Sequence, residues 1–300
     1  DKSNPIQFAT ELNKENVVVA CKGQDSKYGD LQGVKPPEGV PIERHGFTDA
    51  IKDPDRIVRR QILRMRQELS SPCKTPNSLS LQLATGYLSY DNIQTDVDDG
   101  YIKFGSKVFK RLKPGRSGGY QQVDLGGIQI LVNYRNADYP IVSLEDVLSN
   151  KLNPDLIKDK VVLIGVTANT AGDAWYTPYS TIRQTNQETP GVFIQAQMVS
   201  QILSAVLDHR PILWVLPSWG DILWICLWSV VGSTILWRVK SLSNQRCAIV
   251  AIVVVLYGVC AIALLKQGLW APFIPSAFGV VLSSGMVMFI QNRQVFSANS

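Results

Sequence analysis

The chain has 300 residues, of which 45% are hydrophobic and 18% are charged, and its formal net charge is +5 at pH 7. Residues 1–210 hold 25 basic and 24 acidic side chains, a difference of +1, whereas residues 211–300 hold 5 and 1, a difference of +4. The basic excess therefore lies in the C-terminal third. This argues against a nucleic-acid partner, which needs a concentrated basic face on the soluble part. The most basic stretch, residues 56–66, alternates arginines with aliphatic residues and predicts a solvated strand face.

The N-terminal quarter predicts a mixture of helix, strand and turn. Residues 5–16 have a helical pattern and lead into the apolar run 17–21, which predicts a buried strand. A Gly/Pro-rich loop follows. Residues 46–66 predict two strands around the turn Asp53-Pro54-Asp55, because proline presets φ and aspartate side chains hydrogen-bond within turns.

Helices and apolar strands then alternate up to residue 207. We expect a helix over 79–88 and short strands within 101–134. A short helix is expected after Ser143, which begins a capping-box pattern. The apolar run 161–164 predicts a core strand, and residues 191–207 predict a long helix. This alternation predicts an α/β domain with a central mixed, largely buried sheet. The C-terminal runs described next make it an extracytoplasmic domain followed by three transmembrane α-helices.

The C-terminal third predicts the three membrane-spanning helices, at about 219–237, 247–265 and 270–290. Each apolar run approaches or exceeds the 20 or so residues that a bilayer core requires of a helix. The link between the first two runs carries Arg238, Lys240 and Arg246 and no acidic residue. The positive-inside bias places this link in the cytoplasm. Residues 1–210 are then a periplasmic or extracellular domain, residues 211–300 are the membrane region, and the C-terminus is cytoplasmic.

Cysteine usage fits an exported domain. Only Cys21 and Cys73 lie outside the apolar runs, and a lone pair in an oxidising compartment predicts a disulfide; the alternative is two separately buried thiols. The remaining three cysteines fall in the membrane runs, where they are expected to pack as small apolar residues. We expect no metal site, because the chain has two histidines and no paired metal-ligand spacing.

The sequence contains no phosphate-binding glycine loop, no Walker motif and no Gly-x-Ser-x-Gly elbow, so no catalytic residue and no cofactor is assigned. The best candidate for ligand chemistry is the loop 166–180, which follows an expected strand, where α/β folds bind ligands. Its hydroxyl, amide, carboxylate and aromatic side chains suit a small polar ligand. The candidate ligand residues are Thr167, Asn169, Asp173, Tyr176 and Tyr179. The alternative is that this loop braces a turn while its aromatics cover the end of the sheet.

Several segments stand in a characteristic order ahead of the membrane runs. They are VVVACK, GFTDAIKDPDRIVRR, PCKTPNSLSLQLA, LVNYR, KVVLIGVTANTAGDAWYTPYS and PGVFIQAQMVSQILSAVLDHRPILWV. Together with three following membrane helices, this order resembles the CHASE2 family, extracytoplasmic sensory domains of bacterial, especially cyanobacterial, signalling proteins. The resemblance covers essentially the whole chain. It implies a membrane helix and a first βα unit before Asp1, so the domain is expected to lack its N-terminal part. It also implies a fused effector such as a kinase or a cyclase.

Two function classes follow. The favoured one is a membrane-bound sensory input module that detects an extracytoplasmic stimulus and transmits it to an effector outside this chain. On this interpretation the chain is not itself an enzyme. Its expected partners are the lipid bilayer, a small-molecule or environmental stimulus and a signalling effector, and homodimerisation is left open. The alternative is a membrane-anchored enzyme or structural scaffold that uses the loop 166–180 as an active or docking site.

Overall fold

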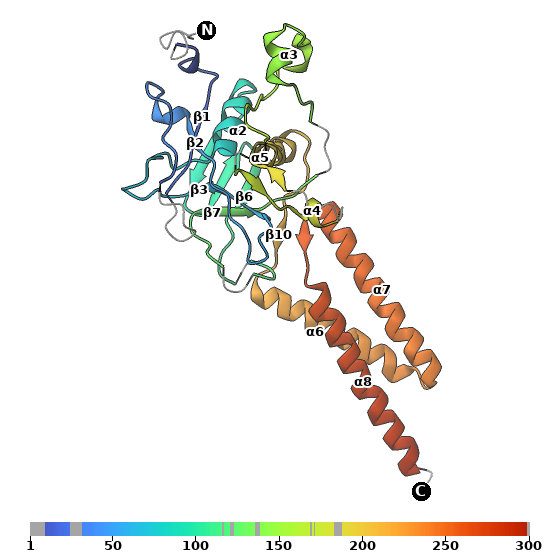
Figure 1. Cartoon of the computed structure of the whole chain (residues 1–300). Coiled ribbons are helices and arrows are strands. Elements are labelled where there is room, and N and C mark those ends of the chain that lie inside the picture. The colour runs from blue at the N-terminus through green and yellow to red at the C-terminus, as the bar shows by residue number, and fades with distance from the viewer. Residues whose placement is uncertain are drawn as a thin grey trace. The chain divides into compact units, whose positions relative to one another are not determined.

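The computed structural model describes residues 10–24, 32–115, 117–120, 123–135, 139–168, 170, 172–182 and 188–298. The chain forms two compact units (Figure 1). The first unit comprises Asp1–Arg111 and Leu125–Arg210, and the second comprises Leu112–Asp124 and Pro211–Ser300. The predicted helix over 5–16 begins among residues 1–9, which lie outside the described residues.

The first unit contains nine of the described strands, all of them short. They are β1 (Val19–Cys21), β2 (His45–Phe47), β3 (Arg60–Arg64), β4 (Thr95–Asp98), β5 (Tyr101–Phe104), β6 (Lys107–Lys110), β7 (Ile128–Leu131), β8 (Ala174–Trp175) and β9 (Thr189–Pro190). The strand β1 pairs with β2 in parallel, whereas β3–β7, β4–β5–β6 and β8–β9 are antiparallel sheets. The fold is therefore the predicted mixture of α and β structure, with several small sheets.

The predicted mixed sheet is built from small sheets of two or three strands, with isolated bridges between strand residues and neighbouring segments. One bridge joins Phe47 to Ser78, another Ile51 to Arg60 and a third Ile57 to Tyr176. All four residues of β7 and four of the five in β3 are buried. The register of this pair shifts between Ile62 and Arg64, so the ladder cannot continue as a regular sheet. The core therefore forms around the short strands β3 and β7, which are buried on both faces.

Four helices in the first unit are described. They are α2 (Leu79–Tyr90), α3 (Leu144–Leu148), α4 (Pro178–Ile182) and α5 (Gly191–Leu207). The hydroxyls of Ser78 and Ser143 accept hydrogen bonds from Leu81 N and Asp146 N, which fixes the starts of α2 and α3. The helices predicted over 79–88, after Ser143 and over 191–207 are all confirmed. Because α2 and α5 pack on each other, they form the helical layer beside the small sheets.

The predicted core strand over 161–164 is wrong. Residues 161–168 are in no strand, and their backbone groups make no hydrogen bond within the described part of the chain. Ile164 is 96% exposed and Val162 is 52% exposed, while Val161 and Leu163 face a cavity beside α5. An apolar run reports a preference for burial, but a strand also needs a neighbouring strand, and none is described beside this one.

The two cysteines of the first unit are joined. The Cys21–Cys73 disulfide links the end of β1 to the loop before α2, with the two Cα atoms 5.5 Å apart. Both cysteines are buried in a cluster with Phe47 and Ile62. The predicted disulfide is therefore present, and it also forms part of a hydrophobic core.

The turn at Asp53-Pro54-Asp55 forms as predicted, with Asp53 N donating to Ile57 O and Arg56 N donating to Asp53 O. The following arginines are not a uniformly solvated face. Arg60 is 2% exposed, and its Nε donates to Asp53 Oδ1 at 2.9 Å. Arg59 instead forms a two-pronged pair with the exposed Asp55, with donor–acceptor distances of 2.8 and 2.7 Å. The Asp53 and Asp55 carboxylates thus hold the turn to β3.

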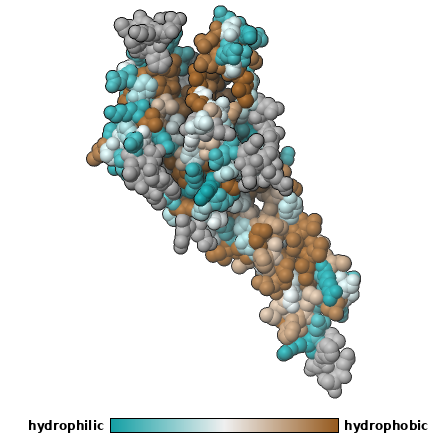
Figure 2. All heavy atoms as spheres, in the orientation of Figure 1, coloured by the Kyte–Doolittle hydropathy of each residue, from teal (hydrophilic) through white to brown (hydrophobic). Residues whose placement is uncertain are grey.

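The second unit contains three helices long and apolar enough to cross a membrane: α6 (Ser218–Arg238), α7 (Leu242–Gln267) and α8 (Phe273–Ala298). The candidate span within α8 is Phe273–Arg293. Figure 2 shows mainly hydrophobic residues on the visible surface of this unit, and Val254, Phe278 and Leu282 are all more than 60% exposed. Exposed aliphatic surface of this kind belongs against lipid, so the predicted three-helix membrane region is confirmed.

Small residues let the membrane helices approach closely. A Cβ built on Gly232 of α6 would lie 3.2 Å from Ser284 Oγ, and one on Gly279 of α8 would lie 2.5 Å from Ser229 Oγ. Ser283 Oγ also donates to Ser229 O. Packing through glycine and serine is the usual way for helices to associate where lipid removes the hydrophobic driving force. The pair α6–α8 is therefore built as a membrane-helix interface.

The segment Leu112–Asp124 belongs to the membrane unit although it lies between β6 and β7 in the chain. Gly115 O accepts hydrogen bonds from both the backbone N and the Oγ of Ser218, the first residue of α6. Tyr120 packs edge-on against Trp270, with ring centroids 6.2 Å apart. Trp270 is in β11 (Leu269–Trp270), which pairs with β10 (Trp214–Val215). This segment thus caps α6 and packs on the α7–α8 connection.

Candidate functional site

The loop predicted to bind a ligand is anchored to the start of α5. A Cβ built on Gly165 would lie 2.8 Å from Val192 Cβ, so the chain can pass here only as glycine. Asp173 O accepts a hydrogen bond from Gly191 N at 2.9 Å, and Asp173 Oδ1 accepts one from Trp175 Nε1 at 2.6 Å. The Asp173 carboxylate therefore lies against the first turn of α5, where the helix dipole favours a negative charge.

The aromatic residues of this loop cover the turn before β3. Val58 N donates to Tyr176 O at 2.9 Å, which joins the loop to the Asp53-Pro54-Asp55 turn region. Tyr179 packs edge-on against Tyr134, with ring centroids 6.4 Å apart, and the Tyr134 hydroxyl donates to Val58 O. Burial raises the pKa of Tyr134 well above its usual value. These internal contacts match the bracing role that the sequence left as the alternative.

The structure brings three of the five predicted ligand residues into this braced region and leaves Thr167 apart from them. Asp173 is exposed, Tyr176 and Tyr179 are half-buried, and Thr167 is exposed on the unpaired segment. Asn169 lies outside the described residues. The ligand assignments stay predictions, and the geometry directs attention to a second location.

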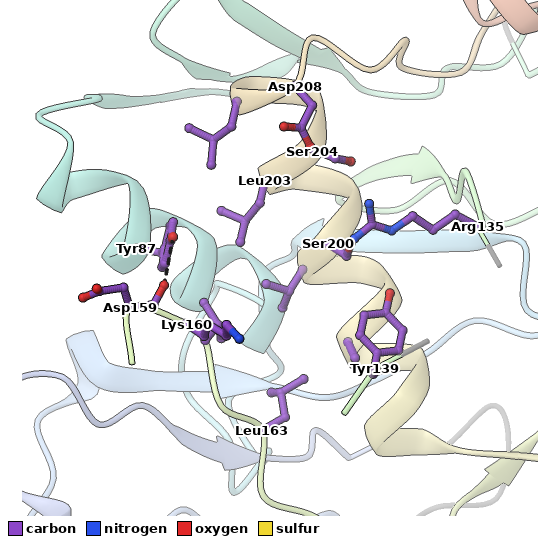
Figure 3. A pocket seen from close by; sticks show the side chains of 14 residues that line it. Tyr87, Arg135, Tyr139, Asp159, Lys160, Leu163, Ser200, Leu203, Ser204 and Asp208 are labelled. Atoms are coloured by element: carbon purple, nitrogen blue, oxygen red, sulfur yellow. Dashed lines mark hydrogen bonds between the residues drawn. The ribbon is translucent and has the colours of Figure 1, made fainter. Parts of the chain in front are cut away.

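That second location is an open cavity of about 260 Å³ between α2, α5 and residues 159–163 (Figure 3). Tyr87 of α2 donates a hydrogen bond to Asp159 O at 3.2 Å and closes one side. One wall of the cavity is apolar and consists of Val161, Leu163, Ala196, Val199, Leu203 and Leu207. The polar and charged lining residues are Tyr87, Arg135, Tyr139, Asp159, Lys160, Ser200, Ser204 and Asp208.

Three of these polar residues carry a buried atom with no hydrogen-bond partner. Arg135 Nε, Tyr139 Oη and Ser200 Oγ are each inaccessible to solvent, and none has a partner in the part of the chain that the structure describes. In Figure 3 the Arg135 side chain extends toward α5 at Ser200, with Tyr139 beside it. Buried polar groups in folded proteins are almost always hydrogen-bonded, so three orphans in one cavity need an explanation.

Two glutamines on α5 hold the segment that carries Arg135. Gln197 Nε2 donates to Arg135 O at 2.9 Å and Gln197 Oε1 accepts from Arg135 N. One turn later, Gln201 Nε2 donates to Leu131 O and Gln201 Oε1 accepts from Asn133 N. These side chains act like an added strand along the end of β7. The sequence analysis did not identify these two residues. The pattern that could have done so is a pair of glutamines four residues apart on a mainly apolar helix.

Arg210 continues this connection at the last residue of the first unit. Its Nη2 donates to Asn133 Oδ1 and to Tyr134 O, both at 3.1 Å. Burial, and then the nearby positive charge of Arg135, lowers the pKa of Arg210. The guanidinium groups of Arg135 and Arg210 thus lie near one another beside α5.

A family model described as the CHASE2 domain matches residues 4–234, well over half of the chain. The matched region runs from the first residues into α6 and so covers the disulfide, the loop 166–180, the cavity and the chain connection to the membrane unit. No curated protein and no solved structure matches the chain.

Proposed function

The chain belongs to the CHASE2 family of extracytoplasmic sensory domains, and we propose that it is a sensory input module whose first unit detects a stimulus and passes it through the three membrane helices to an effector. Any catalytic activity would reside in that effector. The family match and the three apolar helices support a membrane-anchored sensor. The proposed partners are therefore the bilayer, the stimulus and the effector, with a second copy of the chain as an open partner.

The observation that carries the proposal is the way in which α5 leads into the membrane unit. Gln197 and Gln201 tie α5 to the end of β7, and Arg210 ties the exit of α5 to Asn133 and Tyr134. Only residues 211–217 separate this anchor from the start of α6 at Ser218. A change in the first unit that shifts α5 is therefore transmitted through a short, partly anchored connection. A stimulus can drive that shift only through a difference in affinity for the two arrangements.

The proposed orientation places the first unit outside the cytoplasm and the C-terminus inside. It rests on Arg238, Lys240 and Arg246 at the α6–α7 connection. The aromatic residues fit the same orientation, since Trp214 and Trp270 lie on the paired strands β10 and β11, at the opposite end of the helices from the α6–α7 connection. Reporter fusions after Ser243 and after Gly268 test it. The first should report cytoplasm and the second the exterior, and the reverse result would contradict the orientation.

The sensory function is tested with an effector of measurable activity fused after residue 300. A four-residue Gly/Ser insertion after Arg210 keeps all contacts of the first unit but lengthens the connection, so it should abolish the response to stimulus. The matched control is the same insertion after Asn150, in an exposed turn after α3. If the insertion after Arg210 leaves the response intact, the connection from α5 to α6 does not transmit the signal. If the chain without any insertion gives no response to any stimulus, a scaffold or enzyme function is preferred.

A further inference from the structure

We propose that the cavity between α2, α5 and residues 159–163 binds a small monocarboxylate with a compact apolar body. This inference deepens the proposed sensory function by naming the chemical class of a stimulus, and its signalling role rests on that function. Binding itself can be measured without an effector. The cavity has two faces, one with unpaired hydrogen-bond donors and one with aliphatic side chains.

The polar face calls for a negatively charged acceptor. Arg135 has donors only, and the hydroxyls of Tyr139 and Ser200 can both donate. A group that accepts hydrogen bonds from all three would give each of these buried donors the partner that it lacks. The planar guanidinium fork of arginine matches a carboxylate with two parallel hydrogen bonds. The neighbouring charge of Arg210 adds to the attraction for an anion.

The remaining lining residues restrict the polarity, charge and size of the ligand beyond its carboxylate. Val161, Leu163, Val199 and Leu203 present aliphatic carbon to the cavity, which favours an apolar body. Asp159 and Asp208 lie away from Arg135 in Figure 3 and would repel a second carboxylate, while Lys160 Nζ is directed to Asp155 O. A volume of about 260 Å³ is below the range of about 300–1,000 Å³ for drug-sized ligands, so the ligand is small.

The site would also connect binding to the proposed transmission element. Ser200 is on α5, whereas Arg135 and Tyr139 belong to the chain that follows β7. A carboxylate held by all three would clamp α5 to that segment, adding to the hydrogen bonds of Gln197. The bound and free states would then differ in how firmly α5 is held, which is the differential interaction that signalling requires.

The test uses the purified full chain in lipid nanodiscs and benzoate as the probe, with binding followed by isothermal titration calorimetry against empty nanodiscs. We expect a Kd at or below about 1 mM. Benzamide, which has the same shape without the charge, should bind at least about tenfold more weakly. Arg135→Gln should weaken benzoate binding at least about tenfold and Ser200→Ala about threefold or more. The matched control Arg66→Gln removes the charge of an exposed arginine outside the cavity and should bind as the wild type does.

Circular dichroism and the thermal midpoint establish that each variant is folded before it is titrated. Should Arg135→Gln prove unfolded, Ser200→Ala and the benzoate–benzamide comparison decide. The proposal is overturned by equal binding of benzoate and benzamide, by unchanged affinity in the folded variants, or by no saturable heat up to about 10 mM benzoate. Benzoate binding without any response from a fused effector would preserve the site and count against the sensory function. A response from the effector without benzoate binding would support the sensory function and count against the carboxylate site.

Discussion

Removing the Cys21–Cys73 disulfide should destabilise the first unit by about 4 kcal/mol. The two cysteines are 52 positions apart, and for a loop of this length the chain-entropy relation gives about 14 cal/mol/K, or about 4 kcal/mol at 25 °C. This equals a large part of the 5–15 kcal/mol that typically separates folded from unfolded domains. The bond joins β1 to the loop before α2, so its loss frees β1 from the rest of the core.

The measurement is urea unfolding of the full chain in nanodiscs, after complete reduction under denaturing conditions and refolding with reductant present. Reduction keeps both sulfur atoms in the cluster with Phe47 and Ile62, so it isolates the constraint of the bond from the packing of the side chains. The double variant Cys21→Ala and Cys73→Ala removes both, and it should be less stable still. Cys226→Ala, in the exposed surface of α6, is the control and should change stability by no more than about 0.5 kcal/mol.

A reduced chain that unfolds within about 1 kcal/mol of the oxidised chain would refute this reasoning. It would mean that the unfolded ensemble already keeps β1 near the start of α2, so closing the loop removes little entropy. A change in the slope with urea, without a change in the midpoint, would refute it equally, because that slope reports the surface exposed on unfolding.

Three further predictions concern charged and exposed side chains of the first unit. Asp53→Asn removes the buried carboxylate that faces the buried guanidinium of Arg60. It should lower the free energy of unfolding, measured in urea, by about 3 kcal/mol or more, and a decrease of under about 1 kcal/mol would contradict this. The hydrogen bond from Arg59 lowers the pKa of Asp55, so that pair stabilises above the ordinary aspartate pKa of 3.8 and the contribution is lost as the pH falls below it. The stability difference between wild type and Asp55→Asn should therefore be under about 1 kcal/mol and constant from pH 7 to 5, and should shrink below about pH 4, whereas a growing difference would contradict it. Ile164→Ser, at a side chain that is 96% exposed, should change stability by no more than about 0.5 kcal/mol, and a loss of 2 kcal/mol or more would show that this residue is covered in the folded protein.

The elements that the sequence predicts well have signals contained within one segment. The helices α2 and α3 begin at serines whose hydroxyls accept the expected capping bonds, and α5 has a sustained apolar face after Pro190. The membrane helices are longer and even less ambiguous, because length and the absence of charge suffice. In each case the residues that cause the element to form lie within the element or next to it, so the amino-acid sequence alone predicts it.

Apart from the Cys21–Cys73 disulfide, features that depend on a second segment were predicted poorly. The run 161–164 is as apolar as β7, yet β7 has β3 beside it and the other run has no strand beside it among the described residues. Arg60 was expected in solvent because arginine seldom lies in a core, and its burial depends on Asp53 across the turn. The cavity was missed for the same reason, since its walls come from α2, α5 and two separate loops. The spacing of residues along the chain does not indicate that these segments lie together in the folded protein.

The segment Leu112–Asp124 changes the expected route of signal transmission. Besides the chain connection from α5 to α6, the segment Leu112–Asp124 also belongs to the membrane unit, where Gly115 O accepts a hydrogen bond from Ser218 and Tyr120 packs on Trp270. It leads directly into β7, and Gln201 bonds β7 to α5. The two hydrogen-bonded neighbours β7 and α5 therefore each continue into the membrane unit. Under the proposed sensory function, a movement of α5 along β7 would therefore act on two chain connections to the second unit and not on one alone.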